Sequence, residues 1–192
     1  FEDKVVWVKG MKGSERRLAF IRGDLNATRE NPAAYKKHVI PVIEKGDAYT
    51  WFHHGLLDVS TGQHGKDPNF TEPTFEALYE ATYGVAPSGD FYDAYKLVKS
   101  WRDALQKAFW VNKGNPNKGK LVAALNKMIN DPESVAAIEK KVGKYEWRTG
   151  ADGDAAVRTL KSFIKPKALK TLADFKSKQL GYNTVYKEEL TE

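Results

Sequence analysis

The first 54 residues alternate between short apolar runs and helix-like stretches, and this alternation constrains the fold more than any other feature of the chain. Runs rich in Val, Trp, Thr and Phe favour strands over 4–9, 24–28 and 48–54. The intervening segments 13–23 and 31–46 carry helix signals, namely an acidic first turn in one and an Asn-Pro start in the other. The order strand, helix, strand, helix, strand predicts a parallel sheet with right-handed crossovers.

The rest of the chain is predicted to be mainly helical. Apolar residues at helical spacing and cap residues predict helices over 74–84, 88–106, 115–131, 131–143, 152–164 and 166–181. Further short strands are expected over 107–114 and 144–148, and the polar stretch 55–74 is expected to be a loop. Four residues are predicted helix N-caps: Ser14, Asn31, Thr74 and Asp131. The predicted fold class is therefore α/β, a three-layer parallel or mixed sheet flanked by helices.

Composition limits the chemistry. The chain has 192 residues, of which 41% are hydrophobic, and this is enough to build a core. It contains no cysteine, which excludes disulfides, thiolate nucleophiles and Cys-type zinc sites. No window approaches the roughly 18 apolar residues that a membrane-spanning helix needs, so no direct membrane insertion is expected.

The net charge of +6 raises the question of a nucleic-acid partner. The lysines and arginines are interleaved with acids, as in "WRDALQK" and "IEKKVGKYEW", and form no block or stripe. Because a nucleic-acid footprint needs clustered basic residues, no nucleic acid is predicted as a partner. A mild positive field would instead help to collect small anions.

Two passages carry a family resemblance. "VVWVKGMKGSERRLAFIRGDLNATRENPAAYKKHVIPVIEKGDA" (5–48) and "WVNKGNPNKGKLVAALNKMINDPESVAAIEKKVGKYEW" (110–147) resemble the second lobe of the extracytoplasmic receptors of tripartite tricarboxylate transporters, the Bug family. The shared pattern is a strand, a Lys-Gly turn and a helix, followed later by a Gly-x-Pro turn and an Asp-Pro-Glu helix start. The insertion over 58–91 is longer than the family pattern.

The resemblance implies a periplasmic binding protein of type two that lacks its N-terminal lobe. We expect a ligand-binding lobe over 1–110 with a helical insertion over 58–106, and a segment over 111–192 that returns toward the missing lobe. The start at Phe1 suggests that the true beginning has been removed. The implied function is periplasmic capture of a small organic anion for membrane transporter subunits, without a cofactor and without enzymatic activity.

The candidate ligand site follows from the predicted sheet, because ligands bind beyond the carboxyl ends of parallel strands. That edge would carry Thr28, Arg29 and Asn31 after one strand and Gly13 with Ser14 after another. Helix N-termini attract carboxylates, and a guanidinium can hold a carboxylate through two hydrogen bonds. Two alternatives stay open, namely that Arg29 only pairs with Glu30 and that Asn31 is only a helix cap.

His53 is the remaining candidate in the ligand site. His53 and His54 end a predicted strand, so they should point to opposite faces, and only one of them could share a site with His64. No His-x-x-x-His or His-Glu-x-x-His pattern exists, so no metal and no catalytic residue is predicted. The alternatives for function are the effector-binding lobe of a transcriptional regulator and a metal-dependent hydrolase.

Overall fold

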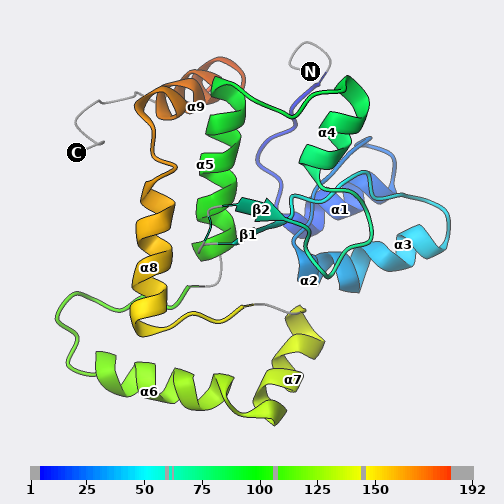
Figure 1. Ribbon diagram of the computed structural model, residues 1–192. Coiled ribbons are helices and arrows are strands. Elements are labelled where there is room, and N and C mark those ends of the chain that lie inside the picture. Colours follow the sequence, from blue (N-terminus) through cyan, green and yellow to red (C-terminus); the bar gives the residue numbers. More distant parts are fainter. Residues whose placement is uncertain (1–4, 59–60, 62, 106–107, 144–145, 183–192) are drawn as a thin grey trace.

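The computed structural model describes residues 5–58, 61, 63–105, 108–143 and 146–182 (Figure 1). These residues form α1 (Gly13–Ile21), α2 (Pro32–Ala34), the π-helical turn η2 (Tyr35–Val39), α3 (Ile40–Glu44), β1 (Leu56–Asp58), β2 (Gln63–Gly65), α4 (Phe75–Tyr83), α5 (Asp90–Leu105), α6 (Lys118–Ile129), α7 (Pro132–Val142), α8 (Gly150–Lys161) and α9 (Pro166–Lys178).

The predicted three-layer α/β sheet is wrong. Within the described residues, the predicted strand segments at 5–9, 24–28, 48–54, 108–114 and 146–148 form no strand. The paired strands are β1 and β2, a short antiparallel hairpin, and a single parallel bridge joins His53 to Thr74. A short apolar run becomes a strand only when a neighbour supplies ladder hydrogen bonds, and in the described residues no strand pairs with these runs. Trp7, for example, lies edge-on to Phe175 of α9, at 6.3 Å between ring centroids.

The β1–β2 hairpin lies inside the polar stretch that was expected to be a loop. Gly55, directly before β1, has φ of +71°, and a Cβ built on it would lie 2.2 Å from the carbonyl oxygen of Gly65. Only glycine permits this backbone conformation together with such a close approach. The hairpin therefore depends on a backbone feature and not on apolar alternation.

The predicted helices are confirmed, with small shifts at their ends. Asn31, Thr74 and Asp131 act as N-caps, each accepting a hydrogen bond from a backbone N–H three residues later. Ser14 is not a cap, because α1 begins one residue earlier and Lys12 occupies the cap position. The helix predicted over 31–46 is interrupted by η2 and restarts as α3, which has Pro41 in its first turn.

The core lies where α8 and β1 pack on α5 (Figure 1). Leu160 of α8 is fully buried with Ala156 and with Leu57 of β1, and Trp101 of α5 packs against this group. Small buried alanines on α5 and α9 let these two helices approach closely. Helices α1 to α4 lie on the other side of α5, and α6 and α7 form an arm at the base of the molecule.

No helix among the described residues has the length and apolarity to span a bilayer. The arm of α6 and α7 contacts the rest of the described structure mainly through α2. The C-terminal helices α8 and α9 pack on α5, so the chain after residue 150 is joined to the proposed ligand-binding lobe through the core.

The N-cap of α4 offers a small, local test of this helical structure. The Thr74 hydroxyl accepts the Ala77 N–H at 3.1 Å. Replacing Thr74 by Ala should lower the free energy of unfolding by about 1 kcal/mol, because that N–H loses its partner. Urea denaturation measures the change, and Thr74→Ser, which keeps the hydroxyl, should restore most of it. An equal loss in both variants would contradict the capping role.

Candidate anion-binding site

Arg29 lies in the loop between α1 and α2 and contacts Arg16 of α1. Its backbone carbonyl accepts a hydrogen bond from Arg16 Nη2 at 2.7 Å. Burial lowers the pKa of the Arg29 guanidinium, and the positive charges of Arg102 and Arg16 lower it further, against the opposing effect of Glu30. The loop and α5, which are distant in sequence, thus bring two arginines within electrostatic reach of each other.

Glu30 forms ion pairs with two arginines of α1. Its Oε1 lies 3.0 Å from Arg17 Nη1 and 3.6 Å from Arg16 Nη2, and its side chain is only 5% exposed. By contrast, no carboxylate within 4.0 Å of the Arg29 or Arg102 guanidinium is found in the described part of the chain. Of the two alternatives for Arg29, a simple pair with Glu30 is therefore not what this structure shows.

Helix α5 supplies further positive charge. Lys99 is buried, and its Nζ lies 3.4 Å from Asp103 Oδ2, one turn along the helix. Burial lowers the pKa of Lys99, whereas the Asp103 carboxylate opposes this shift. Arg102 acts electrostatically on both Arg29 and Asp103. Cations therefore outnumber carboxylates where the loop meets α5.

The pKa of His54 reflects the positive charges of this region. Burial lowers the pKa of His54 to about 4, and the neighbouring charges of Lys99, Arg102 and Arg29 contribute to the shift. The ring is therefore neutral at pH 7, and its Nδ1 lies 2.9 Å from the Tyr95 hydroxyl. Burial also raises the pKa of Tyr95, so this hydroxyl keeps its proton and can donate it to Nδ1. In that tautomer the Nε2 of His54 carries a hydrogen and is a second donor.

Two polar atoms beside Arg29 have no recorded hydrogen bond within the described residues. They are Thr28 Oγ1 and Arg16 Nε, and both are buried. Leaving buried polar atoms unpaired costs roughly 1–3 kcal/mol each, so native sites usually satisfy them with protein, water or ligand. We use the name Arg29 cluster for Arg16, Thr28, Arg29, His54, Lys99 and Arg102.

The structure separates the site residues expected from the sequence. Thr28 and Arg29 belong to the Arg29 cluster. The side-chain oxygen of Asn31 instead accepts a hydrogen bond from the Ala34 N–H at 3.0 Å, as expected for a helix N-cap. Gly13 and Ser14 lie in the first turn of α1, and there the Glu15 carboxylate already binds the Lys12 N–H at 2.9 Å. Glu15 thus already places a negative charge at this helix N-terminus.

His53 points away from the Arg29 cluster. Its ring stacks on Phe70 at 5.2 Å, and its Nδ1 accepts the Gly55 N–H at 2.9 Å. Burial lowers the pKa of His53, while Asp67 opposes this effect. As expected from their adjacency, His53 and His54 face different neighbours, and it is His54, not the predicted His53, that lies among the cations.

The sequence interpretation missed Arg16, His54, Lys99 and Arg102. Their signal was weak because α1 and α5 are ordinary amphipathic helices whose lysines and arginines alternate with acids. A parallel sheet would have kept α5 in an insertion away from residue 29. Only the tertiary structure brings the charges of α1, of α5 and of this loop within electrostatic reach of one another.

A metal site and the Ser100–His64 pair are the two reaction centres to consider in the described residues. No group of three or more His, Asp or Glu side chains suited to a metal ion exists within the described ranges. Ser100 Oγ lies 3.2 Å from His64 Nε2, but the serine is fully buried and gives its proton to the Lys96 carbonyl at 2.6 Å. With that proton committed, His64 Nε2 must donate to Ser100 and cannot act as its base.

Comparisons with family models, with curated proteins and with solved structures return no match for this chain.

Proposed function

We propose that this protein binds a small organic anion with at least one carboxylate at the Arg29 cluster. The observation that supports the proposal is that Arg29 feels the positive charge of Arg102, while no carboxylate lies within 4.0 Å of either guanidinium among the described residues. Like charges at close range are unfavourable, and a bound anion would relieve that repulsion. The cluster is thus better suited to an anion-bound state than to an empty one.

The groups of the cluster have complementary chemistry. Guanidinium groups bind carboxylates through paired, charge-assisted hydrogen bonds, which fix orientation as well as charge. The Thr28 hydroxyl is a neutral donor that has no other recorded partner in the described structure. His54 is neutral at pH 7, so it can donate from Nε2 without adding a charge. An anion with two carboxylates could use both arginines.

The biological role follows only from the sequence resemblance. It would make the chain a periplasmic solute receptor that delivers its anion to tripartite tricarboxylate transporter subunits. The strands predicted over 48–54 and 107–114 do not form in the described residues, so closure of two sheet-based lobes is not part of this proposal. In this proposal the anion binds to the side chains of the Arg29 cluster, which come from α1, α5 and the segments between α1 and β1.

The alternative functions gain no specific support. The effector lobe of a transcriptional regulator shares the parallel-sheet architecture expected for the receptor, and the absence of that sheet from the described residues removes this argument for both. A metal-dependent hydrolase needs a ligand group that the described residues do not assemble.

A thermal-shift titration with succinate tests the proposed site. A ligand at one hundred times its Kd stabilises the native state by about 2.7 kcal/mol, which raises the Tm by several degrees. We expect this increase for the unmodified protein and its loss in both Arg29→Ala and Arg102→Ala. Without ligand, these variants should be as stable as the parent or slightly more so, because each removes charge repulsion.

Arg22→Ala is the matched control. Arg22 is exposed and pairs with Asp24 at 2.7 Å, outside the cluster. This variant loses the same unit of charge, so it should keep the succinate response. A response that persists in Arg29→Ala and Arg102→Ala, or that falls equally in Arg22→Ala, would overturn the assignment of the site.

A further inference from the structure

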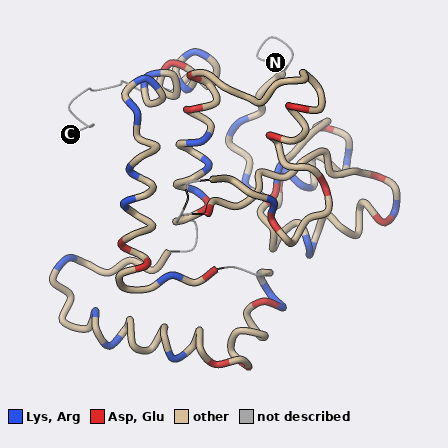
Figure 2. Tube along the Cα trace, in the orientation of Figure 1, with Lys and Arg blue, Asp and Glu red and all other residues tan. Residues whose placement is uncertain are grey.

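The segment 108–130, which leads into α6 and includes it, combines exposed aromatic residues with unopposed positive charge. Phe109 and Trp110 are each 74% exposed, and the following Val111 is exposed as well. Lysines occur at positions 113, 118, 120 and 127, whereas the segment contains no Asp or Glu. Figure 2 shows basic residues and no acidic residues along α6; acidic residues begin only at the turn into α7.

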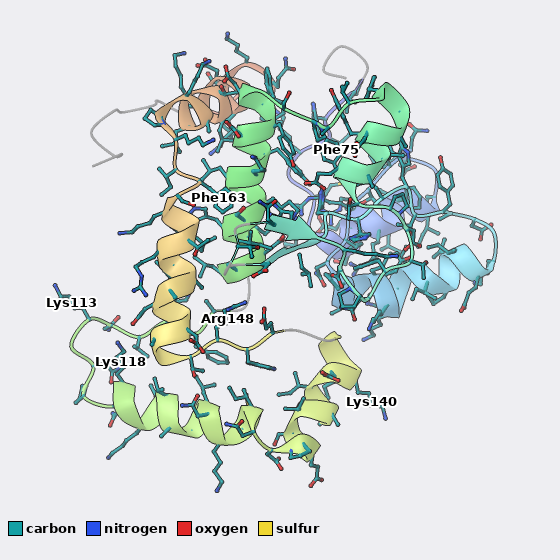
Figure 3. All side chains as sticks on the ribbon, viewed as in Figure 1. Phe75, Lys113, Lys118, Lys140, Arg148 and Phe163 are labelled. Atoms are coloured by element: carbon teal, nitrogen blue, oxygen red, sulfur yellow. The ribbon has the colours of Figure 1, made fainter. Side chains whose placement is uncertain are left out.

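A structured turn holds the first part of this segment. The Asn115 N–H donates to the Asn112 carbonyl at 3.0 Å, and the Lys118 N–H donates to the Asn115 carbonyl at 3.1 Å. Gly114 supplies the positive φ that this turn needs. Lys113 and Lys118 therefore lie at one corner of the molecule, where the loop meets α6 (Figure 3).

Helix α6 adds an incompletely covered apolar stripe. Leu121, Val122, Leu125, Met128 and Ile129 recur at helical spacing. None of the side chains of this fully described helix is buried, and Leu121 is classed as exposed. The polar face opposite the stripe carries Lys120 and Lys127, so α6 is a cationic amphipathic helix with unsatisfied apolar surface.

We infer that the segment 108–130 docks on an anionic lipid surface. Exposed Trp and Phe favour the boundary between acyl chains and headgroups, where an apolar ring can be buried beside polar groups. Lysines are attracted to anionic headgroups, and their long stems let them reach the charged layer from an inclined helix. The absence of acids over the whole segment removes the repulsion that would oppose this contact. The docking is peripheral, and it is independent of the anion site.

Sedimentation of the full chain with vesicles tests the inference. We expect binding to phosphatidylcholine vesicles that contain a quarter phosphatidylglycerol, little binding to pure phosphatidylcholine, and weaker binding as salt increases. The double variant Lys113→Glu/Lys118→Glu should bind at least about tenfold more weakly, since each lysine near the surface contributes appreciably to affinity. Trp110→Ser should also weaken binding, by about three- to tenfold.

The controls carry equal changes elsewhere. Lys37→Glu/Lys45→Glu changes the net charge by the same amount at two exposed positions, one in η2 and one directly after α3. Tyr49→Ser removes an exposed aromatic side chain. Both should bind like the parent. Failure to bind anionic vesicles, or equal losses in the control variants, would overturn the inference.

A second measurement separates lipid from an acidic protein partner. Brominated acyl chains should quench tryptophan fluorescence in the parent, and Trp110→Phe should lose most of that quenching. Binding to polyglutamate as strong as to vesicles, without quenching by brominated lipid, would show that charge alone is recognised. That result would contradict lipid docking and favour an acidic protein.

Discussion

Replacing Leu160 by Ala should lower the free energy of unfolding by about 2–5 kcal/mol, which is the range for a buried Leu-to-Ala change. Leu160 is 0% exposed and lies between β1 and α5 with Ala156 and Leu57. The lost methyl groups would leave a cavity where three elements meet, and small neighbours such as Ala156 cannot fill it. Urea denaturation, followed by far-UV circular dichroism, measures the change.

Leu121→Ala is the matched control for this prediction. Leu121 is also a helical leucine, but it lies on α6 with its side chain exposed. Its replacement should cost less than about 1 kcal/mol, because little apolar area is lost. Equal effects of the two substitutions would contradict a core built from α5, α8 and the hairpin.

Stability should fall steeply between pH 6.5 and pH 4. Burial is the largest cause that lowers the pKa of His54 and of His64 to about 4 in the native state, and nearby lysines add to it. The unfolded chain takes up these protons near pH 6.5, so acidification favours unfolding over this window. After a discount for partial exposure, each histidine should contribute on the order of 2 kcal/mol.

Urea denaturation at a series of pH values tests this dependence. His54→Gln and His64→Gln should each flatten the curve between pH 6.5 and pH 4, because an uncharged amide takes up no proton. A parent protein that keeps its full stability down to pH 4.5 would contradict the buried, neutral state of both rings.

The helices of this protein could be predicted because their signals are local. Thr74 and Asp131 each stand at a helix start, with apolar residues at helical spacing behind them, and both helices form as expected. Strands depend on a partner that may be far along the chain, and "KVVWVK" shows the consequence. The pattern looks like a strand, yet in its described part no neighbouring strand pairs with it. The actual hairpin formed in a polar segment where glycine allows close backbone contact.

The candidate site could be predicted only in part. Thr28 and Arg29 were found because a charged corner before a helix is visible in the sequence. Arg102 could not be found in that way, because its role depends on α5 packing beside residue 29, which is a tertiary contact. His53 was chosen over His54 because adjacent residues on an extended segment face opposite ways, and the sequence does not show which side carries the cations.

The most direct test of anion binding at the Arg29 cluster is an NMR titration of the His54 ring with and without succinate. The depressed pKa of His54 arises in part from Arg29, Arg102 and Lys99, so an anion bound among them must cancel some of that field. We predict that saturating succinate raises the pKa of His54 by about one unit, a differential interaction of about 1.4 kcal/mol. A His54 titration that succinate leaves unchanged would contradict the assignment of the Arg29 cluster as the binding site.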